Sequence, residues 1–195
     1  MKPLVVGTKN KDKLREIEEI LLALPFEIRS IPKEAPDVDE SGTSLEENAK
    51  KKALEYAAIV KGPVLADDTG LFVDALEGAP GIKAARYAGE KATYADNRRK
   101  LVDALKGVPG PKRTARFKCV IALARPGTVL GTFEGSVEGR ILEAPRGAGT
   151  FGYDPLFLVP ELGKTLAELP PQEKNKLSHR ARALERAKPA LLELL

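Results

Sequence analysis

Hydrophobic and polar residues alternate along the chain in two periods, one typical of strands and one typical of helices. Residues 4–6 predict a short buried strand, and apolar residues recur at helical spacing through 14–24. A second helix is predicted from Ser44, because Ser44 and Glu47 have the spacing of a capping box and apolar positions follow on one face through 45–60. The chain therefore begins as strand, loop and helix, with another helix downstream.

The remainder of the chain mixes strands with helices. Strands are predicted at 64–67, 71–75, 115–124, 128–135 and 155–159, and helices at 93–106 and 178–187, before a short apolar segment from Ala190. Residues 114–142 alternate and contain spaced glycines, which favours an antiparallel hairpin or meander. This order predicts an α/β fold with a mixed β-sheet flanked by helices, and we expect residues 1–195 to form a single domain.

Composition narrows the class of protein. With 195 residues, of which 43% are hydrophobic, the chain is long enough to bury a core, and its net charge of +4 modestly favours anionic ligands. Cys119, the only cysteine, lies in an apolar alternation, so we expect a core thiol and a reducing, cytoplasmic location. Charges interrupt every apolar stretch before the ~20 residues that cross a bilayer, so we expect neither a membrane span nor a signal peptide.

The most informative motif is Asp67-Asp68-Thr69-Gly70, directly after an apolar run. Carboxylates at the end of a strand suit a hard cation, and Glu40, in an upstream loop, offers a third. Three lysines suggest a polyanion nearby: Lys13, Lys52 and Lys174. Together these residues predict a magnesium-dependent site for a phosphorylated substrate.

Two simpler interpretations compete with that site. On an extended backbone Asp67 and Asp68 point in opposite directions, so we expect only one to face a metal while the other orients a water or a lysine. Asp-Asp-Thr-Gly is also a common turn composition. Glu40 lies in a polar stretch, 37–42, where a glutamate is normally an ordinary surface residue.

Two further segments have the composition of a ligand site. Residues 7–13 join the first strand to the first helix and offer backbone N–H groups, Thr8, Asn10 and Lys13 to phosphate, although the segment lacks the Walker A pattern. The alternative is a solvated helix start with Asn10 as its N-cap. In residues 149–155 aromatics alternate with glycine, and Phe151 is placed to stack on a base, or to pack a turn. His179, the only histidine, is more often a packing residue in such a position than a catalyst.

Six motifs in order resemble the inosine triphosphate pyrophosphatase family. They are residues 8–13 (TKNKDK), 40–49 (ESGTSLEENA) with Lys52, 66–71 (ADDTGL), 78–82 (GAPGI) with 85–87, 151–155 (FGYDP), and 174–180 (KNKLSHR). The resemblance covers nearly the whole chain. It departs from the family at Leu45, where Phe is frequent, at Thr69, where Ser is usual, and at Lys83, where Tyr is common.

The resemblance implies a Mg2+-dependent homodimer that converts deaminated purine nucleoside triphosphates (ITP, dITP, XTP) to the monophosphate and pyrophosphate. It also implies an elongated sheet with an active-site cleft between two lobes. By this resemblance Asp68 is the proton acceptor, Glu40 and Asp68 bind the metal, and Lys13 and Lys52 are catalytic. The substrate residues it implies are Thr8, Lys9, Asn10, Lys11, Asp12 and Lys13 for the phosphates, Thr69, and Phe151, Gly152, Tyr153, Asp154, Lys174, His179 and Arg180 for the nucleoside.

Two other functions remain open at this point. A pI of about 9.1 and the basic stretches 50–52 and 98–100 raise the possibility of a nucleic-acid-binding module. We do not expect a nucleic-acid partner, because only 5% of residues are aromatic, no recognition motif is present, and such stretches are commonly solvated helix faces. The nearer rival is a magnesium-dependent phosphatase or diphosphatase with a different base preference.

Overall fold

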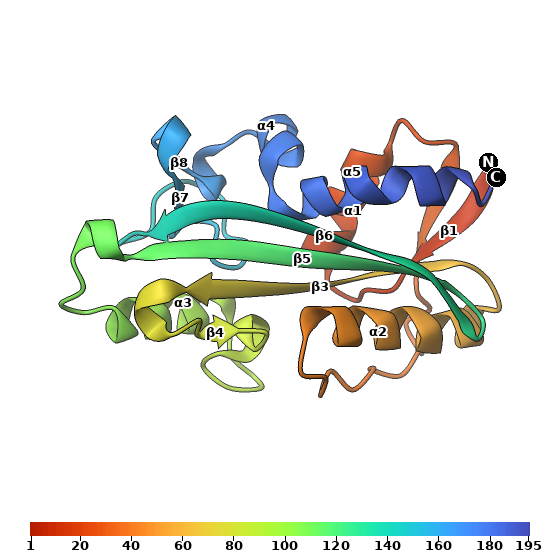
Figure 1. Cartoon of the computed structure of the whole chain (residues 1–195), viewed down its shortest axis with the longest axis horizontal. Coiled ribbons are helices and arrows are strands. Elements are labelled where there is room, and N and C mark those ends of the chain that lie inside the picture. Colours follow the sequence, from red (N-terminus) through yellow and green to blue (C-terminus); the bar gives the residue numbers. More distant parts are fainter. The chain divides into compact units, whose positions relative to one another are not determined.

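The computed structural model describes residues 1–195, which form an array of strands with helices interspersed along the chain (Figure 1). The strands are β1 (Lys2–Val6), β2 (Phe26–Ser30), β3 (Val64–Val73), β4 (Pro80–Gly81), β5 (Thr114–Arg125), β6 (Thr128–Ile141), β7 (Phe157–Val159) and β8 (Lys164–Thr165). The helices are α1 (Lys11–Leu21), α2 (Leu45–Val60), α3 (Tyr94–Ala104), α4 (Pro171–Leu177) and α5 (His179–Leu192), with short 3-10 turns η1 (Asp74–Leu76), η2 (Ala84–Arg86), η3 (Gly110–Lys112), η4 (Pro160–Leu162) and η5 (Leu166–Glu168).

All eight strands belong to one mixed sheet. Its order is β2-β1-β3-β5-β6-β7-β8, and β4 pairs with β3. β1 runs parallel to β2 and to β3, whereas β3–β4, β6–β7 and β7–β8 are antiparallel. β5 and β6 are joined by two residues that include Gly127 at φ 78°, a backbone conformation that favours glycine. The predicted α/β class, the mixed sheet and the hairpin are therefore confirmed.

The chain divides into two compact units. Unit 1 comprises residues 1–68, 119–135 and 179–195, and unit 2 comprises residues 69–118 and 136–178. Each unit has an apolar core of its own.

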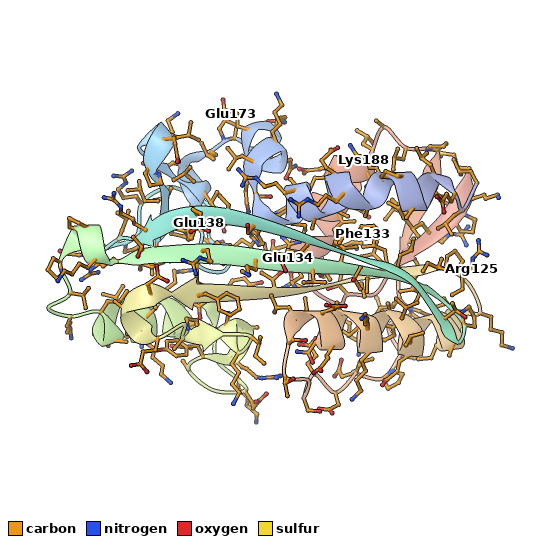
Figure 2. The ribbon with its side chains drawn as sticks, in the orientation of Figure 1. Arg125, Phe133, Glu134, Glu138, Glu173 and Lys188 are labelled. Carbon is orange, nitrogen blue, oxygen red and sulfur yellow. The ribbon has the colours of Figure 1, made fainter.

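In unit 1, α1 and α5 pack together on one face of the strands, and α2 covers the other face (Figure 1). The core includes residues of β1, α1 and α5, and it contains Cys119, which is fully buried, as predicted. Phe133 of β6, labelled in Figure 2, packs against this core. Arg186 of α5 donates a hydrogen bond to the backbone carbonyl of Glu134, the next residue of β6 (2.6 Å). These contacts hold α5 against β6 in unit 1.

In unit 2, the core gathers apolar residues of β3, α3, β5 and the segment before β7. Leu71, Leu101 and Phe157 are fully buried there, and the rings of Phe117 and Phe157 lie 4.7 Å apart. The basic residue Arg113 is also buried, where its side chain donates hydrogen bonds to the carbonyls of Leu105 and Val108 (both 2.9 Å).

The helix starts follow their capping residues. The Asn10 side chain accepts hydrogen bonds from the N–H groups of Asp12 and Lys13, and the Ser44 side chain accepts one from Glu47 (3.1 Å). The predicted capping box is only half formed, because Glu47 Oε2 returns to the N–H of Thr43 (2.7 Å).

Several predicted boundaries are wrong. The two strands predicted at 64–67 and 71–75 are one strand, β3, because the backbone of 68–70 continues the sheet; β3 ends at Val73, and residues 74–75 belong to η1. β6 extends to Ile141, and β7 begins at Phe157 rather than 155. α5 continues through Pro189 to Leu192, since Leu191 packs into the core of unit 1 one turn beyond Ala187. Sequence periodicity missed the short elements β2 and α4 altogether.

None of the helices combines the length and apolar character needed to cross a membrane.

Candidate active site

Asp67 and Asp68 lie within β3 rather than in a turn, so the turn interpretation is wrong. Successive side chains of a strand point to opposite faces. Accordingly, Asp67 contacts residues of α1 and α5, and Asp68 contacts residues of α2. The prediction that the two carboxylates diverge is confirmed, and each has a different electrostatic environment.

Asp67 is 1% exposed and is surrounded by cations. Its Oδ2 lies 3.0 Å from Lys13 Nζ and 3.2 Å from Arg180 Nη2. Burial alone would raise the pKa of Asp67, but the charges of Lys13 and Arg180 outweigh burial and hold that pKa below its usual range. Asp67 therefore remains ionised and holds the ammonium of Lys13 in place.

Arg180 lies at the start of α5 and is almost completely buried. Its guanidinium pairs with Glu16 through Nη1 and with Asp67 through Nη2. The neighbouring His179 is also buried. The structure thus places both residues in the packed interior of unit 1, where Arg180 links α1, β3 and α5.

Asp68 forms an ion pair with one cation only, and at a longer distance than those of Asp67. Its Oδ1 lies 3.5 Å from Lys52 Nζ, and its Oδ2 accepts a hydrogen bond from Asn48 Nδ2 (3.1 Å). Burial raises the pKa of Asp68 above its ordinary value, and the attraction of Lys52 offsets this only in part. A carboxylate with a raised pKa is a better proton acceptor than an ordinary aspartate.

Lys52 joins Asp68 to Glu40. Its Nζ lies 2.8 Å from Glu40 Oε1 as well as 3.5 Å from Asp68 Oδ1. Although burial lowers the pKa of Lys52, the charges of Asp68, Asp67 and Glu40 outweigh burial and raise it, so the ammonium stays protonated. The structure therefore brings Glu40, Lys52 and Asp68 together, and Glu40 is not an isolated surface residue.

Asn48 is a residue of this site to which sequence reasoning gave no role. Besides donating to Asp68, its Oδ1 accepts a hydrogen bond from the N–H of Gly42 (2.9 Å), two residues after Glu40. A Cβ at position 42 would lie 2.6 Å from that oxygen, so glycine admits the contact. The available signal was the i, i+4 spacing of Asn48 and Lys52, which puts two polar groups on the buried face of α2.

The predicted phosphate loop before α1 turns its lysines in different directions. Lys9 pairs with exposed Asp37 (2.8 Å), whereas Lys13 reaches Asp67. Asn10 caps α1, as the alternative interpretation predicts, and Thr8 Oγ1 accepts a hydrogen bond from the N–H of Asn10 (3.1 Å). The same alternative expects the lysines of this segment to be solvated, and this expectation is wrong for Lys13, which pairs with buried Asp67. Lys11 is exposed, and Asp12 pairs with Arg15.

The predicted nucleoside residues of unit 2 cluster around residues 151–154. Lys174 forms an ion pair with Asp154, and its Nζ lies 5.0 Å from the centroid of the Phe151 ring. Tyr153 is buried and donates a hydrogen bond to the carbonyl of Ala84 (2.7 Å); burial raises the pKa of its hydroxyl. Gly152 has φ 51°, which favours glycine. Thr69, also in unit 2, is half-buried in β3.

The basic stretch 50–52 does not form a solvated cationic face. Lys50 pairs with Glu46, Lys51 with Asp39, and Lys52 is buried beside Glu40 and Asp68. The expectation of a solvated face is therefore wrong for Lys52, because its side chain lies on the buried side of α2.

A scan of the chain against protein-family models matches residues 4–190 to the Ham1 family. The chain belongs to the Ham1 family. Sequence relatives agree with this membership. A dITP/XTP pyrophosphatase of Geobacter sulfurreducens is 53% identical over 186 residues, covering 94% of both chains, and one of Geobacillus kaustophilus is 50% identical, covering 94% of this chain and 91% of that relative.

Solved Ham1 structures have the same fold. A HAM1 protein from Coxiella burnetii superposes with a TM-score of 0.88 at 41% identity, covering 99% of this chain and all of that one. The Ham1 protein of Staphylococcus aureus superposes with a TM-score of 0.85 at 36% identity, covering both chains completely. The resemblance inferred from the six motifs is thereby confirmed.

Proposed function

We propose that this Ham1-family chain is a Mg2+-dependent nucleoside triphosphate pyrophosphohydrolase that converts ITP, dITP and XTP to the monophosphate and pyrophosphate. The observation that carries the proposal is that two adjacent aspartates of β3 have different electrostatic environments. Asp67 is neutralised by Lys13 and Arg180, whereas Asp68, beside Lys52 and Asn48, keeps a raised pKa. Full-length relatives named dITP/XTP pyrophosphatase support the choice of substrate.

The reaction needs a proton acceptor, and Asp68 has the environment for one. As the oxygen of a water molecule bonds to the α-phosphorus, its proton passes to Asp68, and the bond from the α-phosphorus to the bridging oxygen breaks. Pyrophosphate leaves with the electron pair of that bond. Asn48 Nδ2 and Lys52 Nζ hold the carboxylate in one orientation during this step.

The lysines of unit 1 supply positive charge for the triphosphate. Asp67 holds the Nζ of Lys13 in place, and 19% of the Lys13 side chain is exposed. Lys52 is protonated beside Asp68. Both charges favour a transition state in which negative charge builds on the phosphate oxygens.

Glu40 and Asp68 are the residues that would hold the Mg2+ ion. Nowhere in the chain do three His, Cys, Asp or Glu side chains gather into a metal-binding group. Two carboxylates nevertheless suit Mg2+, which is commonly bound by one or two carboxylates together with waters and substrate phosphates. Glu40 and Asp68 both pair with the one ammonium of Lys52. Two carboxylates beside one ammonium fit a site that attracts a further cation. When bound, Mg2+ would supply Lewis acidity and screen the triphosphate.

A binding experiment tests the metal assignment without turnover. We expect Glu40→Gln to lower the affinity for Mg2+ about 10-fold or more in titration calorimetry without nucleotide. Asp39→Asn is the matched control, because Asp39 lies in the same loop but pairs with exposed Lys51. Equal Mg2+ affinities of the two variants would contradict the assignment of Glu40.

Selection of the base follows from hydrogen bonding to the 6-oxo group that hypoxanthine and xanthine share. We assign the donors to backbone N–H groups of residues 151–153, since the terminal nitrogens of Arg180 already bind Glu16 and Asp67 and the N–H of Asp154 donates to the carbonyl of Phe151 (3.1 Å). Adenine presents a 6-amino group to such donors and leaves them unpaired, which discriminates by ~10⁴-fold or more in sites built this way.

Turnover of ITP, XTP, dITP, GTP and ATP with Mg2+ tests the proposal, with pyrophosphate measured separately from orthophosphate. We expect pyrophosphate and monophosphate from ITP, dITP and XTP far faster than from GTP or ATP. Release of orthophosphate, or equal rates on all five nucleotides, would overturn the substrate assignment in favour of a phosphatase or a diphosphatase of different preference.

We also propose, on the family resemblance, that the enzyme is a homodimer in the cytoplasm. Light scattering on the purified chain is expected to give about 42 kDa, twice the 21.1 kDa of one chain. Cys119 is buried and forms no disulfide, which is compatible with a reducing compartment.

A further inference from the structure

The basic stretch 98–100, which sequence analysis treats as a solvated helix face, contacts the proposed base segment through one of its residues. Arg98 Nη1 donates hydrogen bonds to the backbone carbonyls of Thr150 (3.0 Å) and Gly152 (2.7 Å). These carbonyls flank Phe151 on either side. A single guanidinium therefore spans the residue whose ring is proposed to meet the base, and the solvated-face expectation is wrong for Arg98.

α3 contacts the ring of Phe151 as well as the backbone around it. Tyr94, four residues before Arg98 and so on the same face of α3, meets Phe151 edge-on with ring centroids 5.6 Å apart. Lys174 Nζ lies 5.0 Å from the same ring. Both the backbone and the ring of Phe151 are thus restrained by side chains outside its own segment.

α3 is firmly anchored within unit 2. A reciprocal capping box between Thr93 and Asp96 closes its first turn. Asn97 is buried, accepts a hydrogen bond from the N–H of Ala88 (2.8 Å) and donates one to the carbonyl of Ala85 (2.9 Å). Leu101 is fully buried in the core. Arg98 therefore projects from a fixed support, which a positioning residue requires.

The neighbouring basic residue, Arg99, does not contact the segment around Phe151. Arg99 is 72% exposed and pairs only with Asp96 across one helical turn, at 3.5 Å. Exposed pairs of this kind contribute little to stability. Arg98 and Arg99 are thus adjacent residues of the same type, and only Arg98 touches the segment before β7.

We propose that Arg98 is a positioning residue for base recognition, which holds Thr150 and Gly152 so that Phe151 and the N–H groups beside it meet the purine. This inference rests on the proposed function, because residues 151–154 are assigned to the nucleoside there. Charge-assisted hydrogen bonds to two carbonyls are stronger than neutral ones and restrict the segment to one conformation. The effect of Arg98 should accordingly be confined to the base end of the substrate.

The test compares two ligands that report on opposite ends of the substrate. Inosine monophosphate carries the base, and inorganic tripolyphosphate carries only phosphates. We expect Arg98→Ala to weaken inosine monophosphate binding about 10-fold in titration calorimetry and to leave tripolyphosphate binding unchanged. With ITP, KM should rise by a similar factor while kcat stays within about 2-fold. Arg98→Lys should restore part of the affinity, because an ammonium still donates to these carbonyls.

Arg99→Ala is the matched control and should equal the wild type with both ligands. Equal loss of inosine monophosphate and tripolyphosphate binding in Arg98→Ala would overturn the inference, because it would show a general structural defect. Should Arg98→Ala not fold, Arg98→Met replaces it, because methionine keeps an unbranched apolar side chain but has no hydrogen-bond donor; wild-type affinity for inosine monophosphate in Arg98→Met would overturn the inference equally. If the wild-type chain does not hydrolyse ITP, the proposed function and this inference are both overturned. If the wild type is active but Arg98→Ala binds both ligands as Arg99→Ala does, only the inference is overturned.

Discussion

Asn48 donates a hydrogen bond from Nδ2 to Oδ2 of Asp68 across 3.1 Å, joining the first turns of α2 to the middle of β3. Its Oδ1 accepts from the N–H of Gly42 at the same time. One amide side chain therefore holds both the proposed proton acceptor and the loop that carries Glu40. The position of Glu40 relative to Asp68 depends on this buried group as well as on Lys52.

Replacement of Asn48 by the similarly shaped Leu tests that dependence. We expect Asn48→Leu to lower kcat for ITP about 10-fold or more and to destabilise the chain by about 1–3 kcal/mol, because buried Asp68 and half-buried Gly42 each lose a hydrogen bond. Steady-state kinetics and urea unfolding measure the two effects. Asn97→Leu is the control, since Asn97 is buried to the same extent and also makes two backbone hydrogen bonds. It should lose stability without an equal loss of kcat, and equal losses of kcat would contradict the role of Asn48.

Asp68→Asn should abolish turnover while the fold is retained. The amide fills the same volume and keeps an oxygen for Asn48 to donate to, but it cannot accept a proton in the pH range of the reaction. We expect kcat to fall by at least about 100-fold with an unchanged circular dichroism spectrum. A folded variant with nearly wild-type activity would rule out Asp68 as the proton acceptor.

Lys13→Ala should mainly weaken substrate binding. Asp67 keeps Arg180 as a partner in this variant, so we expect the fold to persist. The missing ammonium should raise KM for ITP, which initial-rate measurements over a range of concentrations would show. If KM does not change, Lys13 serves only to neutralise Asp67.

Asp67 makes the stability of unit 1 depend on pH. Its pKa in the folded chain lies below the ordinary value of about 4, so the unfolded chain takes up a proton first as the pH falls. The stabilisation is therefore complete above pH 4 to 5 and declines progressively below it. Asp67→Asn should be less stable than wild type by about 3 kcal/mol at pH 7, since a buried pair loses one charge. That difference should shrink at pH 3 in chemical unfolding, and a difference independent of pH would contradict the assignment.

The sequence by itself determined the elements whose ends are marked by local chemistry. α2 begins where Ser44 predicts it, because a cap acts within a few residues of its own position. The opposite directions of Asp67 and Asp68 also follow from the sequence, because side chains alternate along any extended backbone. The six motifs likewise identified the family without reference to a structure.

Tertiary structure alone decided how β3 runs and what its aspartates contact. Asp-Asp-Thr-Gly has the composition of a turn, yet it continues a strand, because pairing with neighbouring strands outweighs the local preference of these residues. Asp67 is held by Arg180, which lies 113 residues away in the sequence, and Arg98 reaches carbonyls more than 50 residues downstream. Periodicity in a sequence reports which face of an element is apolar, whereas the partner that a charged side chain meets is fixed only when distant segments pack together.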